Sequence, residues 1–128
     1  MAEVQAQLQA LSEEYQKLQQ ELQTAVDSRQ KIEAQRQESL GVQKEFERLK
    51  DGESIYKLAG PILLKQDKVE ADSTVKGRLE FIGKELERSE DRIKEIQGKI
   101  EKKKGEIIQT QAGLQAAATA PGKAAVKA

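Results

Sequence analysis

The chain has 128 residues, of which 34% are charged and only 3% are aromatic, and its 22 basic side chains balance its 22 acidic ones. A composition rich in Glu, Lys, Gln, Leu and Ala favours long helices over a compact domain with a large core. Zero net charge argues against nucleic acid or an anionic membrane as a partner, and the absence of Cys and His excludes disulfides, Cys/His zinc sites and Cys/His nucleophile–base pairs.

The first long element is a predicted helix over residues 2–50. Its apolar residues recur at alternating spacings of four and three, which places them on one stripe, the seam of a coiled coil. The stripe weakens after Ile32, where polar residues take the next positions, and it returns at Phe46. Gly52 is the expected C-cap residue. The stripe begins with Val4, Leu8, Leu11, Tyr15, Leu18, Leu22 and Ala25.

Residues 54–66, SIYKLAGPILLKQ, are predicted to form a β-hairpin with its turn at Gly60-Pro61. The two runs are apolar on both faces, whereas a hairpin with one wet face would show a polar residue at every second position. An isolated two-stranded hairpin is also marginal in water. We therefore expect another chain to pair its edges and bury its faces. The alternative is that the hairpin lies back over its own coiled coil.

The second helix is predicted over residues 68–117. Asp67 and Glu70 fit a capping box, although Asp72 or Ser73 offers another cap. The apolar stripe keeps the four-and-three spacing from Val75, Leu79, Ile82 and Leu86 to Ile93, Ile96, Ile100, Ile107 and Leu114, with Ser89, Lys103 and Thr110 as polar members that weaken the seam or fix its register.

Two long helices joined by a hairpin are expected to fold back on each other, with Leu22 near Ile100 and Leu8 near Leu114. Both termini then lie at the tip of the coiled coil, far from the hairpin. Residues 1–117 are thus predicted to be a single domain, and residues 118–128, which are small and weakly basic and contain Pro-Gly, a disordered tail.

No catalytic, metal-binding or cofactor-binding constellation is present in the sequence, so we do not expect an enzyme. The basic run Lys102–Lys104 lies between glutamates and is interpreted as a solvated helix face. Arg29 and Arg36 on the first stripe suggest either a polar functional site or a structural feature, a loosened seam or a contact with a carboxylate of another subunit. The structural interpretation is favoured.

The tip of the predicted coiled coil offers exposed apolar side chains. Ile108 lies off the stripe and should face water. Two interpretations remain open: a patch that binds apolar segments of other proteins, or seam residues at frayed helix ends. The residues concerned are Val4, Leu8, Leu11, Ile107, Ile108 and Leu114.

The stretch SIYKLAGPILLKQDKVEADSTVKGRLEFIGKELER, from Ser54 to Arg88, resembles the β-class subunits of prefoldin, and SRQKIEAQ, from Ser28 to Gln35, is similar to the matching part of their first helix. The resemblance extends over nearly the whole chain, to about Gln115. It implies an all-α fold, a long antiparallel two-helix coiled coil with one inserted hairpin. The single hairpin fits the β class, because α-class subunits have two.

The resemblance further implies a cytoplasmic heterohexamer of this chain with two α-type and three further β-type subunits, without enzymatic activity or cofactor. The hairpins of such a hexamer form a double β-barrel. The arm tips hold non-native proteins, chiefly actin and tubulin chains, without ATP and deliver them to the cytosolic group II chaperonin. The implied barrel residues are Ile55, Tyr56, Leu58, Ile62, Leu63 and Leu64, and the implied client-holding residues are the six at the tip.

The competing class is a structural or tethering coiled coil, for instance a spacer in a larger scaffold. Such a tether would dimerise through its helices and would survive loss of the hairpin. A subunit of the chaperone would need the hairpin to assemble.

Overall fold

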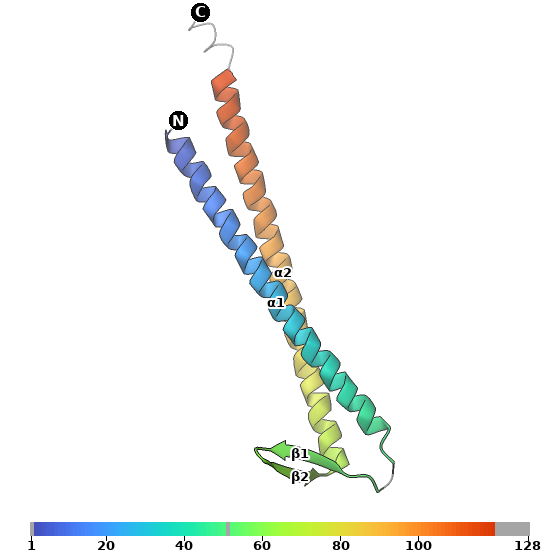
Figure 1. The fold of residues 1–128 in the computed structure, drawn as a ribbon. Helices are drawn as coiled ribbons and strands as arrows, with labels where there is room; N and C mark the ends of the chain where they lie inside the picture. Colours follow the sequence, from blue (N-terminus) through green and yellow to red (C-terminus); the bar gives the residue numbers. More distant parts are fainter. Residues whose placement is uncertain (1, 51, 120–128) are drawn as a thin grey trace, which may run out of the picture. The chain divides into compact units, whose positions relative to one another are not determined.

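The computed structural model describes residues 2–50 and 52–119. Helix α1 (Ala2–Glu47) is followed by strands β1 (Ile55–Ala59) and β2 (Ile62–Gln66) and by helix α2 (Lys68–Thr119) (Figure 1). The predicted fold class, two long helices with one hairpin between them, is confirmed. Neither helix contains a stretch long and apolar enough to cross a membrane, as far as the described residues extend.

The predicted end of the first helix was wrong by three residues. The N–H of Arg48 is shared between the carbonyl oxygens of Lys44 and Glu45, both at 3.2 Å, so α1 tightens and ends at Glu47. Bonds over three residues commonly close an α-helix in this way. Gly52 is therefore not the C-cap. It has φ of +90° and lies in the connection to β1.

The second helix begins where the capping box predicted. The backbone carbonyl of Asp67 accepts the N–H of Ala71 at 2.9 Å, which is the first intrahelical bond that an N-cap residue provides. The helix extends through Thr119, so the boundary of the predicted tail at residue 118 was too early. The rest of that predicted tail, residues 120–128, lies outside the described residues.

The hairpin has a turn of only two residues. Strands β1 and β2 pair antiparallel with Ala59 opposite Ile62, which leaves Gly60 and Pro61 to connect them. Gly60 has φ of +59°, as the first central position of a type II′ turn requires. Proline, whose φ is fixed near about −65°, fits the second central position. This turn type matches the twist of the two strands and fixes their register.

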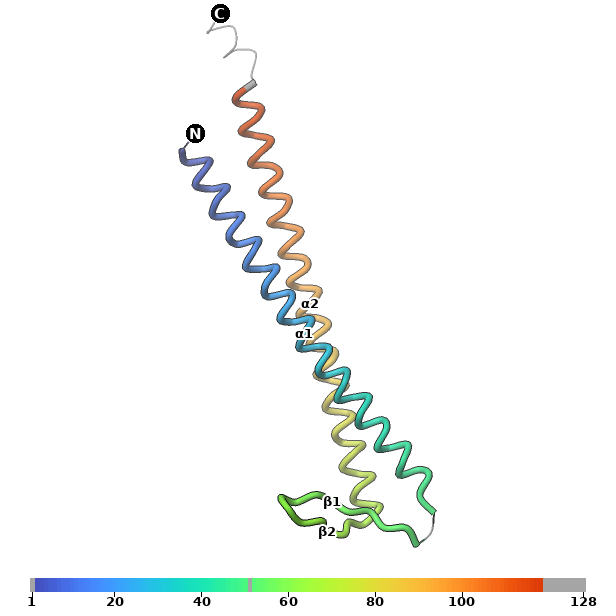
Figure 2. The backbone as a smooth tube through the Cα atoms, viewed as in Figure 1, coloured from blue at the N-terminus to red at the C-terminus, as the bar shows by residue number. Residues whose placement is uncertain are grey.

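The chain divides into two compact units, residues 1–26 with 91–128 and residues 27–90. In the first unit, a buried cluster joins α1 to α2, and Leu22 packs beside Ile100 as predicted. The trace in Figure 2 shows these segments as continuous helices. The cluster consists of Ala25, Ile96 and Ile100, with Tyr15, Leu18, Leu22 and Ile93 packed against it.

The second unit contains the hairpin and the adjoining parts of both helices. Its buried side chains are Ala71, Ile82 and Leu86 of α2 and, on α1, Ser39, one of the polar residues that interrupt the predicted stripe. Ile82 is only 3% exposed. No buried side-chain nitrogen or oxygen lacks a hydrogen-bond partner among the described residues, so the buried serine adds no unsatisfied polar group.

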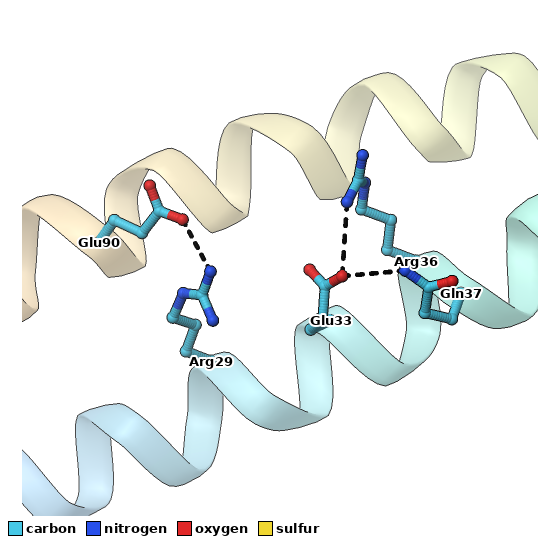
Figure 3. Close-up of polar contacts among 5 residues, drawn as sticks. All are labelled: Arg29, Glu33, Arg36, Gln37 and Glu90. Carbon is cyan, nitrogen blue, oxygen red and sulfur yellow. Dashed lines mark hydrogen bonds and ion pairs between the residues drawn. The ribbon is translucent and has the colours of Figure 1, made fainter.

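The arginines on the α1 stripe have structural partners within the chain (Figure 3). Arg29 Nη2 lies 2.9 Å from Glu90 Oε1 and so links α1 to α2, while Arg36 pairs with Glu33 one turn away. Arg29 therefore has a carboxylate partner on its own chain. The hydrogen bond from Gln37 lowers the pKa of Glu33, and the charges of Arg36 and Arg29 act in the same direction. These contacts stabilise the folded chain near neutral pH and are lost as the pH falls through that lowered pKa.

Replacing Gly60 by valine should destabilise the hairpin by about 1–2 kcal/mol, because an L side chain is strained at positive φ. Amide hydrogen exchange over residues 54–66 should accelerate while the helical circular dichroism stays unchanged. Gly41→Ala is the matched control, because an added Cβ there meets nothing within 4 Å and the site is helical. Unchanged exchange in Gly60→Val would contradict the turn assignment.

A double-mutant cycle of Arg29→Ala and Glu90→Ala should give a coupling energy of about 0.2–1 kcal/mol in urea unfolding, as half-exposed ion pairs do. The pair of Arg88 and Glu85 within α2, at 2.8 Å, is the control, since it does not link the helices. A coupling between Arg29 and Glu90 no different from zero would show that this contact does not help to hold the two helices in register.

Candidate protein-interaction surfaces

The hairpin carries the largest exposed apolar surface among the described residues. Leu58 is 71% exposed, and only Ile55 and Gln66, at the base of the hairpin, are half-buried. The alternative in which the hairpin lies back over its own coiled coil is therefore wrong. We call the following residues the hairpin surface: Tyr56, Leu58, Ile62, Leu63 and Leu64.

Both faces of the hairpin are apolar because of its register. Leu58 lies opposite Leu63 on one face, and Lys57 opposite Leu64 on the other. Cross-strand partners share a face of the sheet, so each face presents exposed leucine beside a single lysine. The structure thus brings five of the six predicted interface residues together in an exposed position and leaves the sixth, Ile55, half-buried at the base.

The strands also keep unpaired edges. Within the described part of the chain, β1 and β2 form a sheet of two strands, so each has one edge whose N–H and C=O groups bond to no other strand. Such edges are templates for strands of another chain. A surface of this kind can add strands at its sides and bury leucine on its faces.

The predicted tip residues lie in the first unit. Lys103 of α2 contacts Glu14 of α1, so the segment before Glu14 and the segment after Lys103 lie at the same end of this unit (Figure 1). Val4, Leu8, Ile107 and Leu114 are half-buried and Leu11 is buried, as seam residues would be. Ile108 is 56% exposed, which confirms that it faces water. Whether these residues hold a client stays a prediction.

Lys103 occupies a seam position beside this end and is half-buried. Its Nζ forms ion pairs with Glu14 across the helices and with Glu106, at 3.4 Å, on its own helix. The hydrogen bond to Glu14 is the main cause that raises the pKa of Lys103, and Glu106 adds to it. The lysine therefore stays charged at neutral pH and supports the register, one of the two roles suggested for the polar seam residues.

Two further apolar side chains of α2 are exposed, Val69 close after β2 and Phe81 farther along the helix. The sequence analysis did not single out Val69. An analysis of the apolar stripe considers only residues on the seam, and Val69 lies off it. Val69 also lies between Asp67 and Glu70, whose charged side chains led this segment to be interpreted as a helix cap. Its position off the seam, next to an unpartnered hairpin, was the available signal. The described residues contain no cluster of acidic side chains suited to a metal ion.

Comparison with known proteins identifies the family to which the chain is similar. The model of the prefoldin subunit family matches residues 9–113. Prefoldin subunit 6 of Saccharomyces cerevisiae is 41% identical over 113 residues, covering 88% of this chain and 97% of the relative. Prefoldin subunit 6 of Homo sapiens is 39% identical over 129 residues, covering 97% of this chain and 100% of the relative.

Solved structures agree with the sequence relatives. The prefoldin beta subunit of Thermococcus strain KS-1 superposes with a TM-score of 0.74 at 28% identity, covering 79% of this chain and 89% of that one. The beta2 subunit of the same strain gives 0.63 at 26% identity, covering 71% and 97%. A family match over most of the chain, near-complete coverage of the relatives and the shared helix–hairpin–helix fold lead to one conclusion: this chain belongs to the prefoldin subunit family.

Proposed function

We propose that this chain is one β-type subunit of a heterohexameric chaperone, assembled with two α-type and three further β-type prefoldin subunits. The hairpin surface carries the proposal, because it is apolar on both faces, open at both edges and left uncovered by the described residues of its own chain. In the assembly, its strands join those of neighbouring subunits in a β-barrel. The chain acts by binding alone, without a cofactor or a catalytic step.

The energetics favour assembly through the hairpin. Burying one leucine side chain fully is worth about 1.5–3 kcal/mol, and the hairpin surface offers five large apolar side chains. Part of this gain offsets the loss of translational and rotational freedom on association. Each further neighbour adds interstrand hydrogen bonds to groups that water otherwise solvates. A closed ring of strands removes the open edges altogether.

The second part of the proposal concerns the client. Six arms hold a non-native protein at their tips in the cytoplasm, chiefly actin or tubulin chains, and deliver it to the group II chaperonin. On this arm, Val4, Leu8, Leu11, Ile107, Ile108 and Leu114 form the holding region, with the exposed Ile108 as the first contact. Several weak apolar tips around one client bind it by multivalency, and each can release on its own. No ATP is required for such binding.

The alternative function, a structural or tethering coiled coil, leaves the hairpin without a role. A tether gains its stability from a helix seam, and here the seam of each unit is satisfied within the chain. An exposed apolar hairpin would then be only an aggregation hazard. The hairpin surface therefore favours the chaperone subunit.

Leu58→Asp combined with Leu63→Asp should abolish assembly with the other subunits while the helices stay formed. Two carboxylates facing each other across the strands cannot be buried without a large desolvation cost. Native mass spectrometry of the tagged chain from its own cell extract should show a six-subunit complex for the unchanged chain and none for the double variant.

Ile108→Asp is the matched control for the hairpin variant, since it also places a carboxylate on an exposed apolar site, outside the hairpin. Assembly of this control should be unchanged. Recovery of a normal complex from the double hairpin variant would contradict the proposal, and a homodimer indifferent to the hairpin would favour the tether.

Removal of residues 1–11 and 107–128 should leave assembly intact and weaken client holding, because the hairpin remains and one of the tips is lost. The measurement is suppression of actin aggregation by the reconstituted complex over a range of concentrations. With six arms sharing a client, we expect the concentration for half-maximal suppression to rise several-fold. Equal suppression by the truncated and full complexes would exclude this tip as a holding site.

A further inference from the structure

One face of the hairpin carries a single charge, and that charge lies at its centre. Cross-strand partners share a face of a sheet, so the register defines which side chains lie beside Lys57. Lys57 belongs to the middle one of the paired rows, directly opposite Leu64. We call this the Lys57 face; its other members are Ile55, Ala59, Ile62, Leu64 and Gln66.

Lys57 has no ionic partner within the described part of the chain. Its side chain is exposed, and it forms no ion pair or side-chain hydrogen bond with any described residue. Its neighbours on the same face of β1 are Ile55 and Ala59, two residues away on either side. Water solvates the ammonium group in the free chain, and a partner that covers the Lys57 face removes that water.

The second lysine of the hairpin is placed differently. Lys65 lies on the opposite face, across from Tyr56 and near the base of the hairpin. Asp67 follows two residues later, beyond the end of β2. Lys65 therefore borders a charged segment at the rim of its face, where a long side chain can keep its ammonium group in water. Apolar side chains surround Lys57 instead, so the two lysines form a matched pair for experiment.

The turn determines which backbone groups of β1 point toward its open edge. In the two-residue turn, the N–H of Ile62 donates to the carbonyl oxygen of Ala59. Hydrogen-bonded and non-hydrogen-bonded pairs then alternate along the antiparallel strands. The backbone groups of Lys57 therefore point toward β2, and those of Tyr56 and Leu58 point outward. A strand added at this edge bonds to Tyr56 and Leu58 and places one of its own residues beside Lys57.

We propose that a strand from the hairpin of a neighbouring prefoldin subunit pairs along the open edge of β1 and places an aspartate or glutamate beside Lys57. The inference rests on the proposed function, because it requires the assembled hexamer. A charge in the middle of a covered apolar face requires a partner of opposite sign. Side chains directly opposite each other on neighbouring strands are the closest on a sheet face, so this position supplies that partner.

The location of Lys57 makes it the residue that selects the neighbour at this edge. Toward the open edge it occupies a non-hydrogen-bonded position, where antiparallel strands bring opposite Cα atoms to about 4.5 Å rather than about 5.5 Å. A neutral side chain there leaves the ammonium group unpaired, and a basic one repels it. Apolar contacts are non-directional, so leucines alone do not distinguish one hairpin from another. The charge of Lys57 does, because it disfavours a neighbour without the carboxylate.

The test is a competition for places in the reconstituted complex. Tagged variants compete with the untagged, unchanged chain for a limiting amount of the other prefoldin subunits, and native mass spectrometry gives the ratio of the two complexes. Lys57→Arg keeps the charge and should compete equally. Lys57→Met leaves the carboxylate unpaired and should compete several-fold less well. Lys57→Glu opposes two like charges and should compete at least about tenfold less well.

Lys65→Met is the matched control and should compete equally, because Lys65 lies at the rim of the other face. Both lysines are exposed, so none of these variants removes a buried side chain.

A second measurement identifies the neighbour. A carbodiimide joins a lysine amine to a carboxylate in contact with it, and we expect peptide mapping of the treated complex to link Lys57 to an Asp or Glu in another subunit's hairpin. The ion pair of Lys103 with Glu14 within this chain is the internal control for the reaction.

The outcomes separate the inference from the proposed function. Competition by Lys57→Met that equals or exceeds that of the unchanged chain overturns the inference, because an apolar side chain is favoured there when no carboxylate faces it. Equal weakening by Lys65→Met also overturns it. So does a Lys57 crosslink to a helix or to its own chain, or none while the Lys103 crosslink forms. In each case the hexamer stands. If the unchanged chain forms no complex with other prefoldin subunits, both fail.

Discussion

A two-stranded hairpin with leucine on both faces is the constraint on which the rest of the structure depends. Its faces and edges are exposed because the described residues form no third strand and pack no other element over the hairpin. Within each unit, the two helices bury apolar side chains against each other along their seams. Among the described residues, the chain is thus paired along its coiled coil and unpartnered at its hairpin.

Polar contacts between the two helices help to fix how the helices pair. Arg29 with Glu90 in one unit, and Lys103 with Glu14 in the other, link α1 to α2 at seam positions where an apolar residue would pack more tightly. Half-exposed ion pairs contribute little stability, but they disfavour shifted pairings of two long helices. Correct register places the helix ends opposite each other and so sets which apolar side chains meet at the tip.

Most of the fold was predictable because local sequence patterns determine its helices and its hairpin. The four-and-three spacing identified both helices, and Gly60-Pro61 between two apolar runs identified the hairpin. The end of α1 was misplaced, since a bifurcated bond at Arg48 closes the helix before Gly52, the expected cap, is reached. The partner of Arg29 and the exposure of Val69 depend on which side of each helix faces its neighbour in the fold. The direction in which a helix face points is a property of the tertiary structure, and the apolar stripe of each helix taken alone does not predict it.

The exposed hairpin affects how the newly synthesised chain behaves before it assembles with other subunits. A newly made copy presents the same leucines and unpaired strand edges to every other protein in its surroundings, so an orphan copy is prone to stick to itself or to be recognised as misfolded. Its abundance should therefore follow that of the scarcest partner, because only incorporation hides these groups. Stoichiometry among the subunits would then be enforced by degradation of the excess rather than by matched synthesis.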